Sequence, residues 1–210
     1  MTVQVGIPRS TRNHPVNRPD RVLGLRRARA VTLLALALPG SMYLYQGEEL
    51  GLPEVIDIPD DRRQDPIFHR SRGTVLGRDG SRVPLPWTRT GASFGFGSGG
   101  AHLPQPRWFA DYSVEAQTDD PGSTLAFYRE AIAIRKVEGA GVDLGWVDDL
   151  GEDVLAFSRP GGWTSATNFG PAPVALPEGH TLISSSPLDD PGQLPPDTTI
   201  WIRSTSSHEA

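Results

Sequence analysis

Length, composition and charge exclude several classes of protein. The chain has 210 residues, of which 37% are hydrophobic, so it can form one large or two small domains with a real core. Its net charge is −5 and both signs are interspersed, so we expect neither a nucleic-acid nor a membrane partner. Cysteine is absent, which rules out disulfides, thiolate metal sites and a thiolate nucleophile.

The first part of the chain carries few structural signals. Residues 1–21 contain three prolines and little apolar periodicity, which predicts a loop. They also lack the apolar core of a signal peptide. The one long apolar segment is interrupted at Pro39-Gly40, short of the ~20 residues that span a bilayer. These features favour a soluble, cytoplasmic protein.

A helix followed by a strand is predicted between residues 21 and 51. Apolar residues on every side of residues 31–38 predict a helix that is covered all round, and Pro39-Gly40 predicts its end. Residues 41–45 are too apolar and too aromatic for an edge strand. We therefore expect this helix and strand to lie inside a larger structure.

A long irregular stretch follows, over residues 52–112, and it is rich in proline and glycine. Such loops are rare unless they are functional, so we expect short helices here that line a site. Next, Ser123 can cap a helix of about four turns, which Gly139 ends.

Short strands separated by Gly and Pro turns predict an antiparallel β-sandwich after Gly139. The predicted strands are 142–147, 154–159, 163–168, 174–176, 180–184 and 198–203.

Several motifs resemble one known family. The run from Ala35-Leu-Ala-Leu-Pro-Gly to Gln46-Gly-Glu-Glu-Leu-Gly51 and the segment Gly77-Arg-Asp-Gly-Ser-Arg-Val-Pro-Leu-Pro-Trp87 resemble the α-glucosidase and oligo-1,6-glucosidase branch of the α-amylase family. Asn13-His14, Val114-Glu-Ala-Gln117 and the segment after Ser123 extend the match. The resemblance implies an α/β plus all-β chain. Residues 1–138 would be the C-terminal part of a (β/α)8 barrel with substrate loops, and residues 139–210 an antiparallel β-sandwich domain.

The resemblance also implies that catalytic residues are missing. In this family the nucleophilic aspartate and the acid/base glutamate follow the fourth and fifth barrel strands, upstream of Met1. A third carboxylate belongs to an Asn-His-Asp motif, which stands here as Asn13-His14-Pro15. Glu48-Glu49 is no substitute, because neighbouring residues of an extended segment point to opposite faces, whereas retaining glycosidases need two carboxyl groups about 5 Å apart. We expect these glutamates to support a turn and the chain alone to be inactive.

His14 and Arg82 are the candidate substrate-binding residues. His14 resembles the family histidine that hydrogen-bonds sugar hydroxyls, although a lone loop histidine can equally be exposed or structural. Arg82 matches an arginine that helps to hold the non-reducing glucose, and Trp87 offers a flat face that a pyranose could cover. The alternative is a surface pair of Arg78 and Asp79 beside a packed Trp87.

The remaining histidines, His69, His102, His180 and His208, lack metal-ligand spacing, so we expect neither metal nor cofactor. The leading interpretation is the C-terminal portion of an α-glucosidase that hydrolyses short α-glucosides with retention. Its expected partners are the α-glucoside and the missing N-terminal half of the enzyme. The alternative is a non-catalytic remnant that binds sugar or a partner protein.

Overall fold

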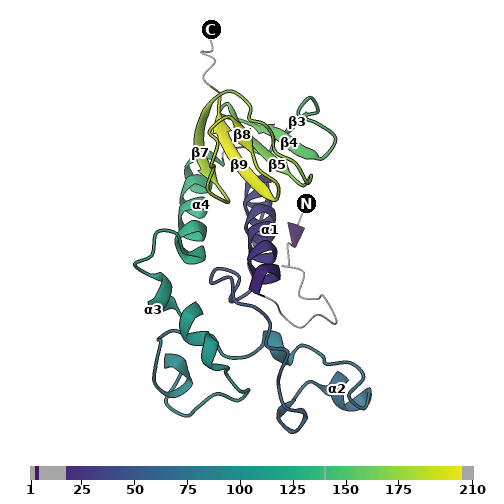
Figure 1. Ribbon diagram of the computed structural model, residues 1–210, viewed down its shortest axis with the longest axis vertical. Coiled ribbons are helices and arrows are strands. Elements are labelled where there is room, and N and C mark those ends of the chain that lie inside the picture. Colours follow the sequence, from purple (N-terminus) through teal and green to yellow (C-terminus); the bar gives the residue numbers. More distant parts are fainter. Residues whose placement is uncertain (1–2, 5–17, 140, 205–210) are drawn as a thin grey trace. The chain divides into compact units, whose positions relative to one another are not determined.

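The computed structural model describes residues 3–4, 18–139 and 141–204, and it divides into two compact units (Figure 1). The helix–sheet unit comprises Met1–Leu44 and Phe127–Ala210, and the loop unit comprises Tyr45–Ala126. The boundary predicted near Gly139, between residues 1–138 and 139–210, stays a prediction.

A five-stranded antiparallel sheet forms the centre of the helix–sheet unit, with the strand order β3-β4-β5-β9-β7. Its strands are β3 (Gly145–Val147), β4 (Val154–Arg159), β5 (Trp163–Asn168), β7 (His180–Ser184) and β9 (Thr198–Arg203). A separate antiparallel pair joins β6 (Val174–Ala175) to β8 (Gln193–Leu194). Each strand predicted after Gly139 is present, with β3 shorter than the predicted 142–147 and β6 shorter than 174–176, and β8 was not predicted.

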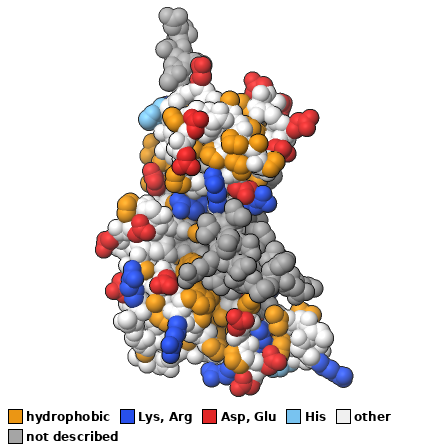
Figure 2. Space-filling view, in the orientation of Figure 1, with side chains coloured by type: hydrophobic (Ala, Val, Ile, Leu, Met, Phe, Trp, Pro, Cys, Tyr) orange, Lys and Arg blue, Asp and Glu red, His pale blue; other side chains and the backbone are white. Residues whose placement is uncertain are grey.

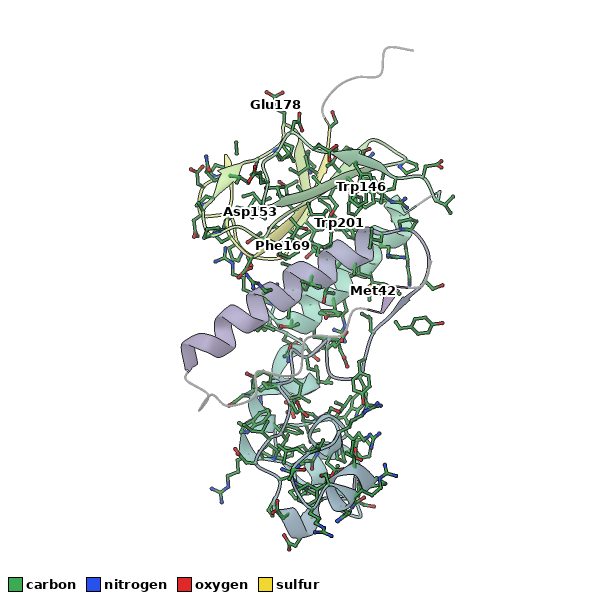
Figure 3. All side chains as sticks on the ribbon, turned by 90° about the vertical axis from the view of Figure 1, so that its right-hand side faces the viewer. Met42, Trp146, Asp153, Phe169, Glu178 and Trp201 are labelled. Atoms are coloured by element: carbon green, nitrogen blue, oxygen red, sulfur yellow. The ribbon has the colours of Figure 1, made fainter. Side chains whose placement is uncertain are left out.

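Two helices cover one face of this sheet: α1 (Arg18–Ala37) and α4 (Thr124–Glu138) (Figure 1). On that face Trp163 and Trp201 are buried with their ring centres 5.0 Å apart, and Trp201 lies between sheet and helices (Figure 3). The opposite face packs Ala166 and Ile200 against Leu194 of β8. Successive strand residues thus serve two cores, which confirms the predicted sandwich and adds a helical layer to it.

Arginine 135 of α4 closes the C-terminal end of α1. Its guanidinium donates to the carbonyl oxygens of Leu36, of Leu38 at 3.2 Å and of Gly40 at 2.6 Å. Burial, and then the nearby charge of Arg159, lower the pKa of the Arg135 side chain below its ordinary value. The last carbonyls of a helix have no partner within it and favour a cation, so α4 supplies the cap that the sequence of α1 lacks.

The segment after α1 differs from its prediction. Only Met42–Tyr43 form a strand, β2, which pairs in parallel with β1 (Val3–Gln4). Tyr43, Leu44 and Tyr45 are 63%, 38% and 41% exposed. The expectation of a buried strand over residues 41–45 is therefore wrong for this structure, because the described residues cover this segment on too few sides.

Within Tyr45–Ala126, regular structure consists of short helices, as predicted for residues 52–112. These are α2 (Pro66–Arg70), α3 (Val114–Gln117) and 3-10 helices at Asp60–Arg62, Asp79–Ser81, Ala92–Gly95 and Arg107–Tyr112. They enclose a small apolar core of Val55, Ile58, Val83, Leu103 and Phe109. Figure 2 shows charges of both signs among apolar side chains on the visible face. None of the described helices combines the length and hydropathy needed to cross a membrane.

Candidate functional site

Arg82 lies at the surface of the loop unit, directly after the 3-10 helix Asp79–Ser81. Its side chain is 46% exposed, and its Nη1 lies 3.4 Å from Oδ2 of Asp65. The next residue, Val83, is buried in the core of this unit. The chain therefore presents the guanidinium at the surface while the neighbouring side chain anchors the backbone.

Asp65 is the residue against which Arg82 is placed. Its Oδ1 accepts from the backbone N–H of Ile67 at 3.0 Å and caps α2, as the sequence Asp65-Pro66 favours. Its Oδ2 accepts from the backbone N–H of Arg78 at 2.8 Å. The backbone hydrogen bonds from Ile67 and Arg78, and the Arg82 charge to a smaller extent, lower the pKa of the Asp65 carboxyl. The group is held as an anion.

Asp79 has a different role from the surface pair with Arg78 that the sequence left open. Its buried carboxylate accepts from the backbone N–H groups of Gln64 at 2.9 Å and Asp65 at 3.0 Å. The segments 64–67 and 78–82 are therefore joined by carboxylates in both directions. This reciprocal arrangement fixes the loop that carries Arg82.

Two glycines allow the close approach of these segments. At Gly77, where φ is +71°, an added Cβ would lie 2.6 Å from Cγ of Asp65. At Gly80 an added Cβ would lie 2.3 Å from the carbonyl oxygen of Val55. Both glycines of the Gly77-Arg-Asp-Gly80 motif are thus required by packing.

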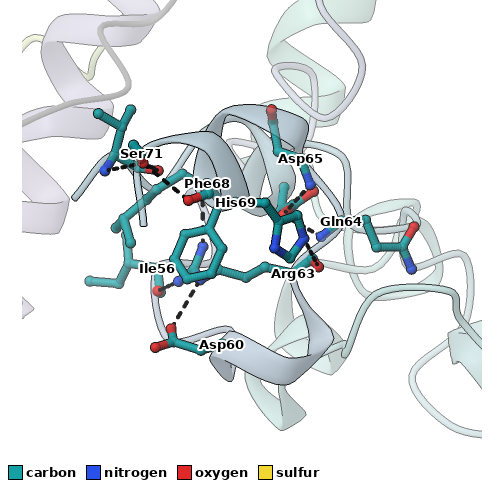
Figure 4. Close-up of polar contacts among 11 residues, drawn as sticks. Ile56, Asp60, Arg63, Gln64, Asp65, Phe68, His69 and Ser71 are labelled. Atoms are coloured by element: carbon teal, nitrogen blue, oxygen red, sulfur yellow. Dashed lines mark hydrogen bonds and ion pairs between the residues drawn. The ribbon is translucent and has the colours of Figure 1, made fainter. Parts of the chain in front are cut away.

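A buried arginine, Arg63, ties the base of this loop together (Figure 4). Its Nη2 donates to the carbonyl oxygen of Ile56 at 2.9 Å, and its Nε lies 3.6 Å from Oδ1 of Asp60. The guanidinium also lies over the ring of Phe68, 5.2 Å from its centre, and His69 Nε2 lies 3.1 Å from the carbonyl oxygen of Arg63. Sequence reasoning missed Arg63, because a single arginine in a charged loop gives no signal of burial.

Trp87 is exposed by 51%, while its backbone is held on both sides. Its N–H donates to the carbonyl oxygen of Phe94 at 2.8 Å, and its own carbonyl oxygen accepts from Glu115 N–H at 2.9 Å. Gln105 Nε2 donates to the carbonyl oxygen of Pro84 at 2.9 Å. Because Trp87 is 51% exposed, the predicted alternative of a packed Trp87 is wrong, and its ring is available at the surface. Other aromatic rings pack within the loop unit, with the ring centres of Trp108 and Phe109 4.8 Å apart.

Gln117 is a structural centre that the sequence did not reveal. Its Nε2 donates to the carbonyl oxygens of Leu50 at 2.9 Å and Tyr112 at 3.2 Å, and its Oε1 accepts from Leu125 N–H at 3.1 Å. The predicted cap Ser123 accepts from Ala126 N–H at 3.1 Å, which confirms the start of α4. One amide side chain thus joins three segments of the loop unit, at Leu50, Tyr112 and Leu125.

His14, with Asn13 and Pro15, lies outside the described residues. Glu49 accepts from the N–H of Gly47 at 2.8 Å, which confirms its role in the turn. Within the described part of the chain, no three His, Asp or Glu residues come together in a group that could hold a metal ion.

Comparisons with known proteins agree on one family. A family model described as alpha amylase, catalytic domain, matches residues 10–142. The chain is 34% identical over 113 residues to a probable alpha-glucosidase of Rhizobium meliloti (strain 1021), covering 54% of this chain and 20% of that protein. It is 28% identical over 133 residues to an oligo-1,6-glucosidase of Parageobacillus thermoglucosidasius, covering 54% and 24%. It therefore spans about a quarter or less of the length of these curated relatives.

Solved structures give the same result. The alpha-glucosyl transfer enzyme XgtA matches with a TM-score of 0.68 and 34% identity, over 84% of this chain and 35% of that chain. The trehalulose synthase MutB matches with a TM-score of 0.72 and 24% identity, over 96% and 42%, which shows the fold alone. Because the family model covers more than half of the residues, and the loop that carries Arg82 lies inside the match, this chain belongs to the alpha-amylase family.

Proposed function

We propose that this chain forms the C-terminal portion of an α-glucosidase that hydrolyses short α-glucosides with retention at the anomeric carbon. Residues 1–138 would contribute late barrel elements and substrate loops, and residues 139–210 the β-sandwich domain. The observation that carries the proposal is the family match over residues 10–142, which includes the ordered loop around Arg82. The chain would be a truncated part of the enzyme. We propose a cytoplasmic location, with which the absence of cysteine is compatible.

His14 and Arg82 are the proposed sugar contacts. A guanidinium offers five N–H donors in a fixed plane, and the contact with Asp65 uses only Nη1. The half-exposed side chain therefore keeps donors for sugar hydroxyls, and the exposed ring of Trp87 offers an apolar face. His14 is assigned by its place in the Asn13-His14-Pro15 motif.

The chain alone is proposed to be inactive. Asp65 and Asp79, the buried carboxylates beside Arg82, already accept backbone hydrogen bonds, and the pKa of Asp65 is lowered. A general acid needs the opposite shift, toward neutral pH. The nucleophile and the acid/base would come from the N-terminal half of the enzyme, our proposed partner. Exposed Tyr43 and Leu44, on a segment whose sequence is typical of a covered strand, support such a partner.

An assay of the purified chain with an aryl α-glucoside tests this proposal. We expect turnover no higher than that of the buffer blank, because both catalytic carboxyl groups are missing. Activity that follows the protein through successive purification steps would contradict the assignment of catalysis to another segment.

A further inference from the structure

We propose that Asp65 is a positioning residue that holds the Arg82 guanidinium in one orientation. Asp65 would act on a sugar only through Arg82, so its relevance to binding rests on the proposed function. The orientation itself is a property of this chain and can be measured without a sugar.

The contacts of Asp65 make it a rigid support. The residue is 8% exposed, and its carboxylate is fixed by backbone N–H groups on two segments, at Ile67 and Arg78. Its own N–H is bound by Asp79 at 3.0 Å. Glycine 77 lies against its Cγ, where an added Cβ would be 2.6 Å away. Neither the carboxylate nor its backbone can move without breaking several of these contacts.

Arg82 needs such a support because of its place in the loop. A long side chain that is 46% exposed has many accessible rotamers, and ordering it upon binding costs free energy. A sugar hydroxyl accepts a hydrogen bond only from a donor that is directed at its oxygen, so the geometry of the N–H donors matters. An anion fixed 3.4 Å from Nη1 restricts the rotamers that the Arg82 side chain occupies before a ligand binds.

The test measures the rotation of arginine guanidinium groups by nitrogen-15 NMR in the complete chain. Asp65→Asn removes the charge but keeps an oxygen that can cap α2, since Asn caps helices about as well as Asp. We expect the Arg82 Nη groups to rotate about two- to fivefold faster, the factor expected for a half-exposed ion pair. Arg63 provides the internal reference, because its guanidinium is buried in the same unit and bonded to the carbonyl oxygen of Ile56.

Two further variants complete the design. Asp60→Asn is the matched control, because it removes a carboxylate that is 83% exposed and lies beside Arg63 and not Arg82, and we expect unchanged Arg82 rotation. Asp65→Ser keeps a capping oxygen without the charge and repeats the test if Asp65→Asn does not fold. The proposal is overturned if Arg82 rotates at the wild-type rate in the folded Asp65 variant, or if its rate changes only together with that of Arg63.

A separate measurement tests the proposed function. Saturation-transfer NMR with methyl α-glucoside would compare the wild-type chain with Arg82→Lys, which keeps the charge but loses the planar donors. No difference between them would contradict Arg82 as a sugar contact and leave its orientation by Asp65 standing. Unchanged rotation in the Asp65 variant, together with a loss of sugar signal in Arg82→Lys, would contradict the positioning role alone.

Discussion

Replacing Arg135 should destabilise the helix–sheet unit strongly, because one side chain from α4 caps the end of α1. Arg135→Met keeps the length of the side chain but removes every donor to the carbonyl oxygens of Leu36, Leu38 and Gly40. Hydrogen bonds from a charged donor contribute about 1.5–3 kcal/mol each. Burial of the cation offsets part of this sum, and water can reach the oxygen of Gly40. We therefore expect a loss of about 2–3 kcal/mol in the free energy of unfolding.

Urea unfolding, followed by near-UV circular dichroism, measures this loss. The rings of Trp163 and Trp201 are packed 5.0 Å apart in the core beside α1, so their signal reports on the helix–sheet unit. Arg129→Met is the matched control, because Arg129 is an exposed arginine on the same helix. We expect it to change the unfolding free energy by less than about 0.5 kcal/mol. If both variants lose the same amount, the capping role of Arg135 is refuted.

Three other predictions concern the loop unit. Gln117→Ala should lower the unfolding free energy of this unit by about 2–4 kcal/mol in hydrogen-exchange measurements, because it leaves buried backbone groups of Leu50 and Leu125 without partners; wild-type exchange rates would contradict this. Gly80→Ala should lower the yield of folded protein, because the added Cβ would lie 2.3 Å from the carbonyl oxygen of Val55. Wild-type yield and stability of this variant would show that the backbone can shift to make room at little cost. The ionised Asp65 carboxylate should stabilise the unit at pH values above its unfolded pKa of about 3.9, because its pKa is lowered in the folded state. This stabilisation should be lost as the pH falls through the lower pKa of the folded state. Acid titrations of wild type and Asp65→Asn should therefore converge at low pH, and parallel curves would exclude a contribution from this carboxyl.

The sequence predicted elements where the pattern was regular. Short strand-like runs bounded by Gly and Pro turns located β4 and β5, and Ser123 located the start of α4. It was misleading for residues 41–45, where composition indicated a buried strand but the described residues leave Tyr43 exposed. An apolar composition indicates that a segment is buried in the complete protein, but the residues that cover it can belong to another segment.

The candidate site was predicted in part. Arg82 and Trp87 were proposed as candidates because their motif resembles that of a family, and the structure adds that both are exposed. The supports of Arg82 were not predicted. Asp65 is 17 positions away from Arg82 in the sequence, and a contact between two irregular segments has no periodicity that could reveal it.

We propose that this chain supplies one part of a glycosidase pocket and lacks the catalytic carboxylates. The direct test mixes it with the N-terminal part of the Rhizobium meliloti relative that precedes the matched region, and compares Pro15 with Pro15→Asp. Association itself costs several kcal/mol, about 4 or more, so turnover of an aryl α-glucoside is measured only on complexes that co-elute. We predict turnover with Pro15→Asp and much less with Pro15. A stable complex in which both give equal turnover would contradict the claim and, with it, the assignment of His14.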